Sequence, residues 1–147
     1  MKDVVIDIRS EQAGDEDGKD FLEFSTDGEY MFDGENGCFS YLESDVTGME
    51  GTRTSVAVTP EEIVVDRDGY ITSRMVFREG AKSRFLYDTP YGAATLGIDT
   101  RKIKKSFNEN GGSLEIDYVV DMEHTVVSRN IFKLNITEQK REQQWQI

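Results

Sequence analysis

The sequence contains one cysteine, one histidine and two prolines among its 147 residues. A single cysteine, Cys38, cannot form an internal disulfide, so the fold must be held by its own core. With only His124 available, a zinc site would have to be built from carboxylates and Cys38. A Ser-His-Asp triad would need that one histidine, and no Gly-x-Ser-x-Gly motif presents a nucleophile. The sequence therefore predicts no metal, no cofactor and no histidine-based active site.

Long apolar runs are also missing. No segment approaches the roughly eighteen uninterrupted apolar residues of a membrane-spanning helix. The first residues, MKDVVIDIRSEQ, are interrupted by Asp3 and Asp7 and do not form the apolar centre of a signal peptide. Together with the unpaired cysteine, this favours a reducing compartment, and we expect a cytoplasmic protein.

Positive charge is scarce. Seventeen basic residues stand against twenty-nine acidic ones, which gives a net charge of −12. Such a field repels phosphate backbones and anionic lipid head groups, so we expect neither nucleic acid nor membrane as a partner. The one dense basic segment, residues 101–105, is interpreted as a solvated strand end.

Apolar residues are nevertheless sufficient for a core, since they make up 37% of the chain and include eight Phe and six Tyr. We expect a single domain over residues 1–147, in which residues 138–147 form a peripheral polar tail.

Asp-Gly and Asn-Gly pairs, typical of tight hairpin turns, punctuate the chain. They are Asp17-Gly18, Asp27-Gly28, Asn36-Gly37, Asp68-Gly69 and Asn110-Gly111. Between them lie short runs rich in Val, Ile, Thr, Tyr and Phe, which predict strands. The predicted strands lie near 3–10, 20–26, 29–34, 38–45, 52–59, 62–67, 70–79, 82–89, 92–101, 112–121 and 125–136. Some of these are expected to be parts of one bent strand.

Apolar and polar side chains alternate with a period of two, most clearly from Leu114 to Val120. Between Val126 and Ile136 the phase slips, which predicts a β-bulge. Residues 103–108 are compatible with one or two helical turns. Many antiparallel strands with one apolar face must close into a barrel or stack as a sandwich, and their nearly unbroken up-and-down order favours the barrel. We therefore predict an all-β, antiparallel up-and-down barrel of about 8–10 strands.

Several polar residues fall on faces that otherwise look inward. They are Tyr41, Glu43, Thr54, Arg67 and Tyr87. A charge inside an apolar interior needs a partner, and Glu43 and Arg67 can supply each other. In one interpretation these residues line a pocket for a small apolar or amphipathic ligand. In the other, they form a structural ion pair that closes one end of a barrel filled by its own side chains, or they lie at strand ends exposed to solvent.

Three classes of function stay open. The first is a binding module that holds a ligand in the barrel. The second is a protein-interaction module that uses the acidic surface or the C-terminal tail with Trp145. The third is an enzyme with Glu43 as general acid or base, which lacks an identifiable second carboxylate.

Five segments also carry a family resemblance. They are YLESDVTGMEGTRTSVAV (41–58), the Asp-Arg-Asp-Gly turn (66–69), MVFREG (75–80), YDTPYGAATLGIDT (87–100) and GGSLEIDY (111–118). In these segments the chain resembles the YwiB-like family of small bacterial proteins of unknown function. The resemblance implies a calycin-type, lipocalin-like barrel and no particular activity. Its pattern includes the five inward polar residues and adds Phe77 to the candidate pocket residues.

Overall fold

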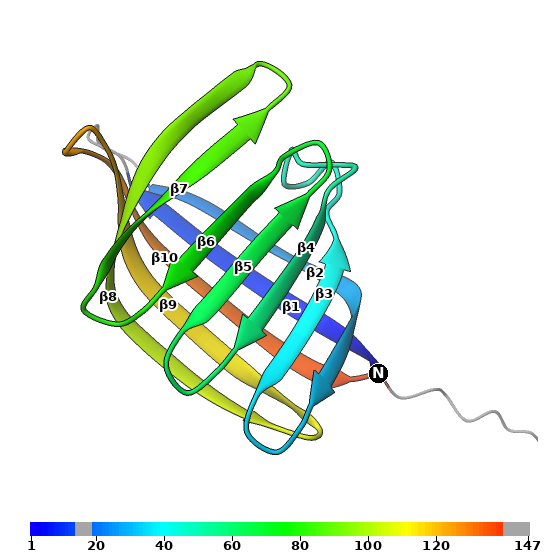
Figure 1. Cartoon of the computed structure of the whole chain (residues 1–147). Helices are drawn as coiled ribbons and strands as arrows, with labels where there is room; N and C mark the ends of the chain where they lie inside the picture. Colours follow the sequence, from blue (N-terminus) through cyan, green and yellow to red (C-terminus); the bar gives the residue numbers. More distant parts are fainter. Residues whose placement is uncertain (14–18, 140–147) are drawn as a thin grey trace, which may run out of the picture.

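The computed structural model describes residues 1–13 and 19–139, and these residues form ten strands and no helix (Figure 1). The strands are β1 (Lys2–Ala13), β2 (Lys19–Phe32), β3 (Gly37–Leu42), β4 (Arg53–Val58), β5 (Ile63–Asp68), β6 (Ser73–Phe77), β7 (Lys82–Thr89), β8 (Gly92–Asn108), β9 (Gly111–Met122) and β10 (Thr125–Glu138). With no helix among the described residues, none is available there to span a membrane.

The strands form one antiparallel sheet in the order β6-β5-β4-β3-β2-β1-β10-β9-β8-β7. The first and last strands pair with each other in the middle of this sheet, from Val4 opposite Glu138 to Ala13 opposite Arg129. The sheet curls into a barrel because its two edge strands, β6 and β7, come together (Figure 1). Each strand otherwise pairs with its neighbours in the sequence, with one exception. The predicted all-β up-and-down barrel is confirmed.

The exception is the junction between β6 and β7, which we call the β6–β7 seam. Among the described residues, the one backbone bridge across this seam joins Thr72 and Asp88. At the other end, the turn between the two strands is bonded to β8, where Gly80 donates to the Thr100 carbonyl and Thr100 to the Ala81 carbonyl. The barrel is therefore nearly closed, and its weak junction lies in the middle of the chain.

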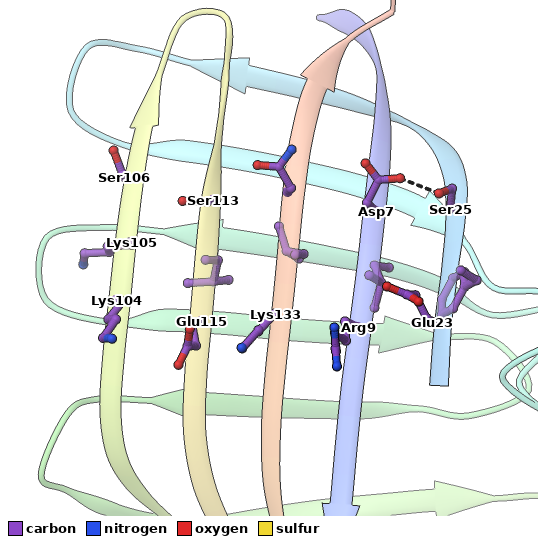
Figure 2. Close-up of a pocket in the computed structure, with 15 residues that line it drawn as sticks. Asp7, Arg9, Glu23, Ser25, Lys104, Lys105, Ser106, Ser113, Glu115 and Lys133 are labelled. Carbon is purple, nitrogen blue, oxygen red and sulfur yellow. Dashed lines mark hydrogen bonds between the residues drawn. The ribbon is translucent and has the colours of Figure 1, made fainter. Parts of the chain in front are cut away.

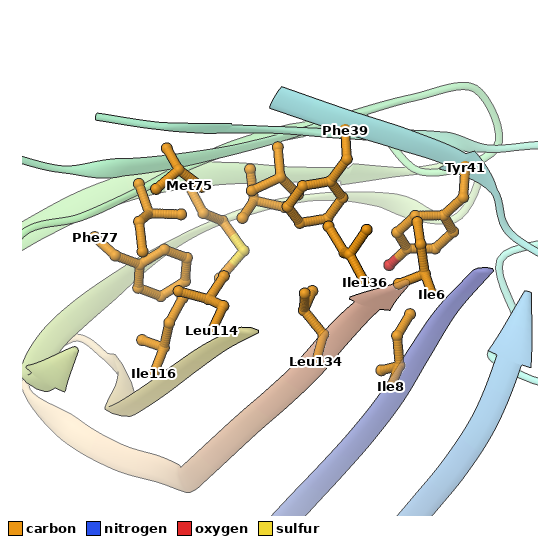
Figure 3. Packing of buried hydrophobic residues seen from close by; sticks show 14 of the residues in the cluster. Ile6, Ile8, Phe39, Tyr41, Met75, Phe77, Leu114, Ile116, Leu134 and Ile136 are labelled. Carbon is orange, nitrogen blue, oxygen red and sulfur yellow. The ribbon is translucent and has the colours of Figure 1, made fainter. Parts of the chain in front are cut away.

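The core fills the inside of the barrel because side chains alternate along each strand. In β1, Val4, Ile6 and Ile8 are buried while Asp7 and Arg9 are exposed. Figure 3 shows side chains of β1, β9 and β10 facing those of β3 and β6 across the interior. Each fully buried Ile, Leu, Val or Phe contributes about 1.5–3 kcal/mol relative to an exposed one, so this interior dominates the stability.

The predicted turn at Asp27-Gly28 is wrong, because the predicted strands 20–26 and 29–34 are one long strand, β2. A Cβ at Gly28 would lie 2.5 Å from Cδ1 of Ile6 and 2.7 Å from the carbonyl oxygen of Ser40. Glycine therefore serves here to let β1 and β3 approach β2 closely.

The predicted helical turns at 103–108 are also wrong, since β8 continues through them and pairs with β9 as far as Asn108 opposite Gly111. Ile103 and Phe107 pack against the core from this extension. A register shift between Val126 and Ser128 confirms the predicted bulge in β10.

The turns at Asp68-Gly69 and Asn110-Gly111 are confirmed, with φ of 142° at Gly69 and 146° at Gly111. Near Asn36-Gly37 a turn is present, but its left-handed residue is Gly34, with φ of 103°, and Gly37 starts β3. Asp17-Gly18 and Trp145 lie outside the described residues. Glu138, the first residue of the predicted tail, is the last residue of β10.

Candidate ligand-binding site

Four polar residues form one row across the inner face of β3, β4, β5 and β6. Tyr41 lies opposite Thr54, Thr54 opposite Arg67, and Arg67 opposite Ser73. The row faces inward because each member shares the phase of apolar core residues on its strand. Tyr41, Thr54 and Ser73 are buried, and the Arg67 side chain is 18% exposed.

Glu43 lies just beyond the end of β3, beside this row, with its side chain only 1% exposed. The Thr47 hydroxyl donates to Oε1 of Glu43 at 2.9 Å, and the Thr54 hydroxyl donates to Oε2 at 2.5 Å. Nε of Arg67 lies 3.9 Å from the same Oε2, so the two predicted partners do form an ion pair. Both carboxylate oxygens thus have a hydroxyl donor before any ligand is considered.

Arg67 is less well satisfied than Glu43. One of its terminal nitrogens lies 3.6 Å from the sulfur of Met75, which is a weak acceptor. Its buried Nε has no acceptor within hydrogen-bonding distance among the described residues. The buried hydroxyl of Ser73 also has no hydrogen-bond partner among them. An unpaired buried donor costs about 1–3 kcal/mol, so an additional acceptor at this point would stabilise the protein.

A cavity of about 30 Å³ adjoins the row. Its polar lining consists of Tyr41, Thr54, Arg67 and Tyr118, and its apolar lining consists of Val56, Val65, Met75, Phe77, Ile116 and Phe132. Tyr118 meets Phe77 edge to face, with ring centroids 4.8 Å apart. The volume suffices for a water molecule or a small head group, and the lining is amphipathic.

Of the six candidates from the sequence, four line this cavity: Tyr41, Thr54, Arg67 and Phe77. Glu43 does not line it and instead pairs with Arg67. Tyr87 is half-buried and packs against the core from β7, on the far side of the β6–β7 seam.

Burial raises the pKa of Tyr41, and the negative charge of Glu43 raises it further, which outweighs the opposing effect of Arg67. Burial also raises the pKa of Tyr118. Both phenols are therefore neutral at physiological pH and can donate or accept hydrogen bonds inside the barrel.

Sequence reasoning missed Tyr118, Ser73 and Met75 as lining or neighbouring residues. The signal was present in the strand period, because Tyr118 follows Leu114 and Ile116 in phase, and Ser73 stands between Ile71 and Met75. The alternation along single strands cannot show that β9 lies across the barrel from β5, where Tyr118 and Arg67 line the same cavity.

His124 lies in the exposed turn between β9 and β10, with φ of 70°. Across residues 1–13 and 19–139, no group of three or more His, Cys, Asp or Glu side chains is arranged to hold a metal ion.

A larger hollow, of about 770 Å³, lies on the outer face of β2, β1, β10, β9 and β8 (Figure 2). Two rows of side chains cross it from β2 to β8. One row has mostly short polar side chains: Ser25, Asp7, Asn135, Ser113 and Ser106. The neighbouring row is charged: Glu23, Arg9, Lys133, Glu115 and Lys104. Most of these side chains are exposed, so water can satisfy their charges and hydroxyls. None of the described residues that line the hollow has a buried unpaired group of the kind found at Arg67.

The comparisons with known proteins agree with this barrel. The family profile described as "Domain of unknown function (DUF1934)" matches residues 6–134. The chain is 28% identical over 104 residues to the "Uncharacterized beta-barrel protein YwiB" of Bacillus subtilis (strain 168), which covers 71% of this chain and 72% of that protein. The crystal structure of the B. subtilis ywiB protein superimposes with a TM-score of 0.84 at 21% identity, over 95% of this chain and 93% of the other. The chain therefore belongs to the DUF1934 family of β-barrel proteins, for which no function is established.

Proposed function

We propose that the protein is a non-enzymatic binding module that holds a small apolar or amphipathic molecule inside the barrel, with its polar end at Arg67. The observation that carries this proposal is the buried Nε of Arg67, which has no acceptor among the described residues and belongs to a side chain that lines an amphipathic cavity. A ligand oxygen at this point would complete the hydrogen bonding of the row, while its apolar part would contact the Val, Ile, Met and Phe side chains of the lining.

The cavity of about 30 Å³ must enlarge to hold more than a head group. Met75 and Phe77, two of its lining residues, belong to β6, which has a continuous hydrogen-bonded ladder on its β5 side but a single bridge beyond its end on the β7 side. Separating β6 from β7, while β6 stays paired with β5, therefore breaks few hydrogen bonds, which include the bond from the Ser83 hydroxyl to the Val76 carbonyl. Met75 is also unbranched, so its side chain can change rotamer at low cost.

The same seam provides a route to the cavity. Ser73, Met75 and Phe77 of β6 face the interior on one side of it, and Phe85 and Tyr87 of β7 face the interior on the other. We infer that a ligand enters between β6 and β7, where the smallest number of backbone bonds resists opening.

An enzymatic role for Glu43 has less support. Both its carboxylate oxygens accept from threonine hydroxyls, it does not line the cavity, and it forms an ion pair with Arg67. A general acid or base must reach the proton that it transfers, and this geometry does not present Glu43 to a substrate.

Native mass spectrometry after incubation with cell extract tests the proposal. We expect a small-molecule adduct on the wild-type protein and on Arg74→Met, but not on Arg67→Met. Arg74 is a matched control because it pairs with Asp66 on the outer face with its side chain 68% exposed. A wild-type protein that carries no adduct, and that binds no fluorescent fatty-acid, alcohol or naphthalene probe, would show that the row is a structural ion pair in a filled barrel.

A further inference from the structure

We infer that the ligand of this site presents an uncharged hydrogen-bond acceptor, such as an alcohol, aldehyde or ester oxygen, to Arg67 and is not an acid. This inference rests on the proposed function, since it specifies the chemical class of a ligand in the same cavity. It follows from the balance of charge around Arg67, taken together with the hydrogen bonds that are already made there.

Arg67 already has its counter-ion. Glu43 lies 3.9 Å from Nε of Arg67, and its side chain is almost fully buried. A ligand carboxylate at Arg67 would place a second negative charge in a site that contains one positive charge. Two buried carboxylates that share one cation repel each other, which weakens the binding of the second.

The rest of the cavity offers a ligand carboxylate little compensation for its lost hydration. Its other polar lining residues are Tyr41, Thr54 and Tyr118, which are uncharged. The Thr54 hydroxyl already donates to Glu43, so it cannot donate to a ligand at the same time. A charged head group would therefore lose its hydration without gaining a second cation.

An uncharged acceptor avoids this cost and still meets the need of the site. One oxygen with two lone pairs can accept from Nε of Arg67, and a ligand hydroxyl can in addition donate to a neighbouring tyrosine oxygen. The apolar lining formed by Val56, Val65, Met75 and Phe77 suits a short hydrocarbon attached to that oxygen.

The test compares 1-octanol with octanoate at pH 7.5, where octanoate is ionised, in calorimetric titrations of the full chain. The two probes have the same chain length and differ in the head group. For the wild-type protein we expect 1-octanol to bind at least about tenfold more tightly than octanoate. In Glu43→Gln the amide can accept from one of the hydroxyls of Thr47 and Thr54 and donate to the other, while the negative charge is removed. We therefore expect the preference to shift towards octanoate by at least about tenfold.

The outcomes separate the two proposals. If neither probe binds the wild-type protein, the proposed lumen site itself fails. If octanoate binds the wild-type protein as tightly as 1-octanol or more tightly, the lumen site stands and the inference about an uncharged head group is overturned. If Glu43→Gln binds both probes with the wild-type preference, Glu43 does not set the selectivity, and the charge argument is wrong. Thermal unfolding of Glu43→Gln checks that the variant is folded. The comparison of 1-octanol with octanoate on the wild-type protein tests the inference even if the variant does not fold.

Discussion

Replacing Arg67 by methionine is the perturbation that we expect to reveal most about the interior of the barrel. The variant leaves Glu43 buried without its cation. At 3.9 Å and an effective dielectric constant of about 20, two unit charges attract each other by about 4 kcal/mol. Water reaches part of Arg67, whose side chain is 18% exposed, and Glu43 keeps its two threonine donors. We therefore expect a loss of about 3 kcal/mol in the free energy of unfolding at pH 7.

The loss can be measured by urea or thermal denaturation. For a domain of this size, about 3 kcal/mol corresponds to a decrease in Tm of about 6–12 °C. The surface variant Arg74→Met removes an ion pair in which both side chains are exposed, and it should cost less than about 0.5 kcal/mol. It therefore serves as the control for removing an arginine.

The double variant Glu43→Gln/Arg67→Met separates the cost of an unpaired buried charge from the cost of losing the Arg67 side chain. It removes both charges while the amide can still bond to Thr47 and Thr54, so it should recover to within about 1 kcal/mol of the wild-type stability. Two results would refute the argument: an Arg67→Met protein within about 0.5 kcal/mol of the wild type, or a double variant no more stable than that single variant.

Three further predictions concern titration, turns and the seam. The pKa of Tyr41 in the folded protein is raised above its unfolded value of 10.0. Its contribution to the free energy of unfolding is therefore fully present below pH 10 and decreases as the pH rises above that value. Tyr41→Phe should weaken this alkaline loss of stability in denaturation curves measured from pH 8 to 11. Gly69→Ala should lower the free energy of unfolding by at least about 2 kcal/mol, because the added Cβ would collide with the carbonyl oxygen of Gly51. Gly34→Ala should cost about 1 kcal/mol, because a Cβ at that position would meet no described atom within 4 Å. Equal losses in urea denaturation would contradict the steric argument. Amide hydrogens of β6 that face β7 should exchange at least about tenfold faster than those that join β1 to β10, as measured by NMR, and equal protection would show that the seam is closed in solution.

Much of this fold follows from the strand period. Alternation predicted correctly that Tyr41, Glu43, Thr54 and Arg67 face inward, because a residue in phase with Phe39, Val56 or Val65 has no other direction in which to point. The pairing of Glu43 with Arg67 followed from the cost of burying either charge alone.

The wrong predictions, a turn at Asp27-Gly28 and helical turns at 103–108, have a common physical cause. In both places, contacts between distant parts of the chain decide the local structure. An Asp-Gly pair reads the same way in a turn and in a continuous strand, and at Gly28 the contacts with Ile6 and Ser40 decide between them. Likewise, Ile103 and Phe107 follow a helix-compatible spacing, but pairing with β9 and packing on the core hold them in a strand.

The position of the seam and the size of the cavity could not be predicted from the sequence. The turn at residues 78–81 resembles the other hairpin turns, yet its backbone bonds to Thr100 of β8. The cavity depends on how Met75, Phe132 and Tyr118 pack. The sequence predicts that the strands of Tyr118 and Phe132 are neighbours, but it does not place Met75 of β6 against them.

The most direct test of a ligand site at Arg67 is the NMR signal of its Nε–H group. This signal can be assigned by its absence from Arg67→Met and followed while 1-octanol is added. We predict a saturable shift of the Arg67 Nε–H signal, together with shifts of the Met75 methyl and the Tyr118 ring, as the unpaired donor gains an acceptor. An Arg67 signal that stays fixed at saturating 1-octanol would contradict the account and leave Glu43 and Arg67 as a structural ion pair.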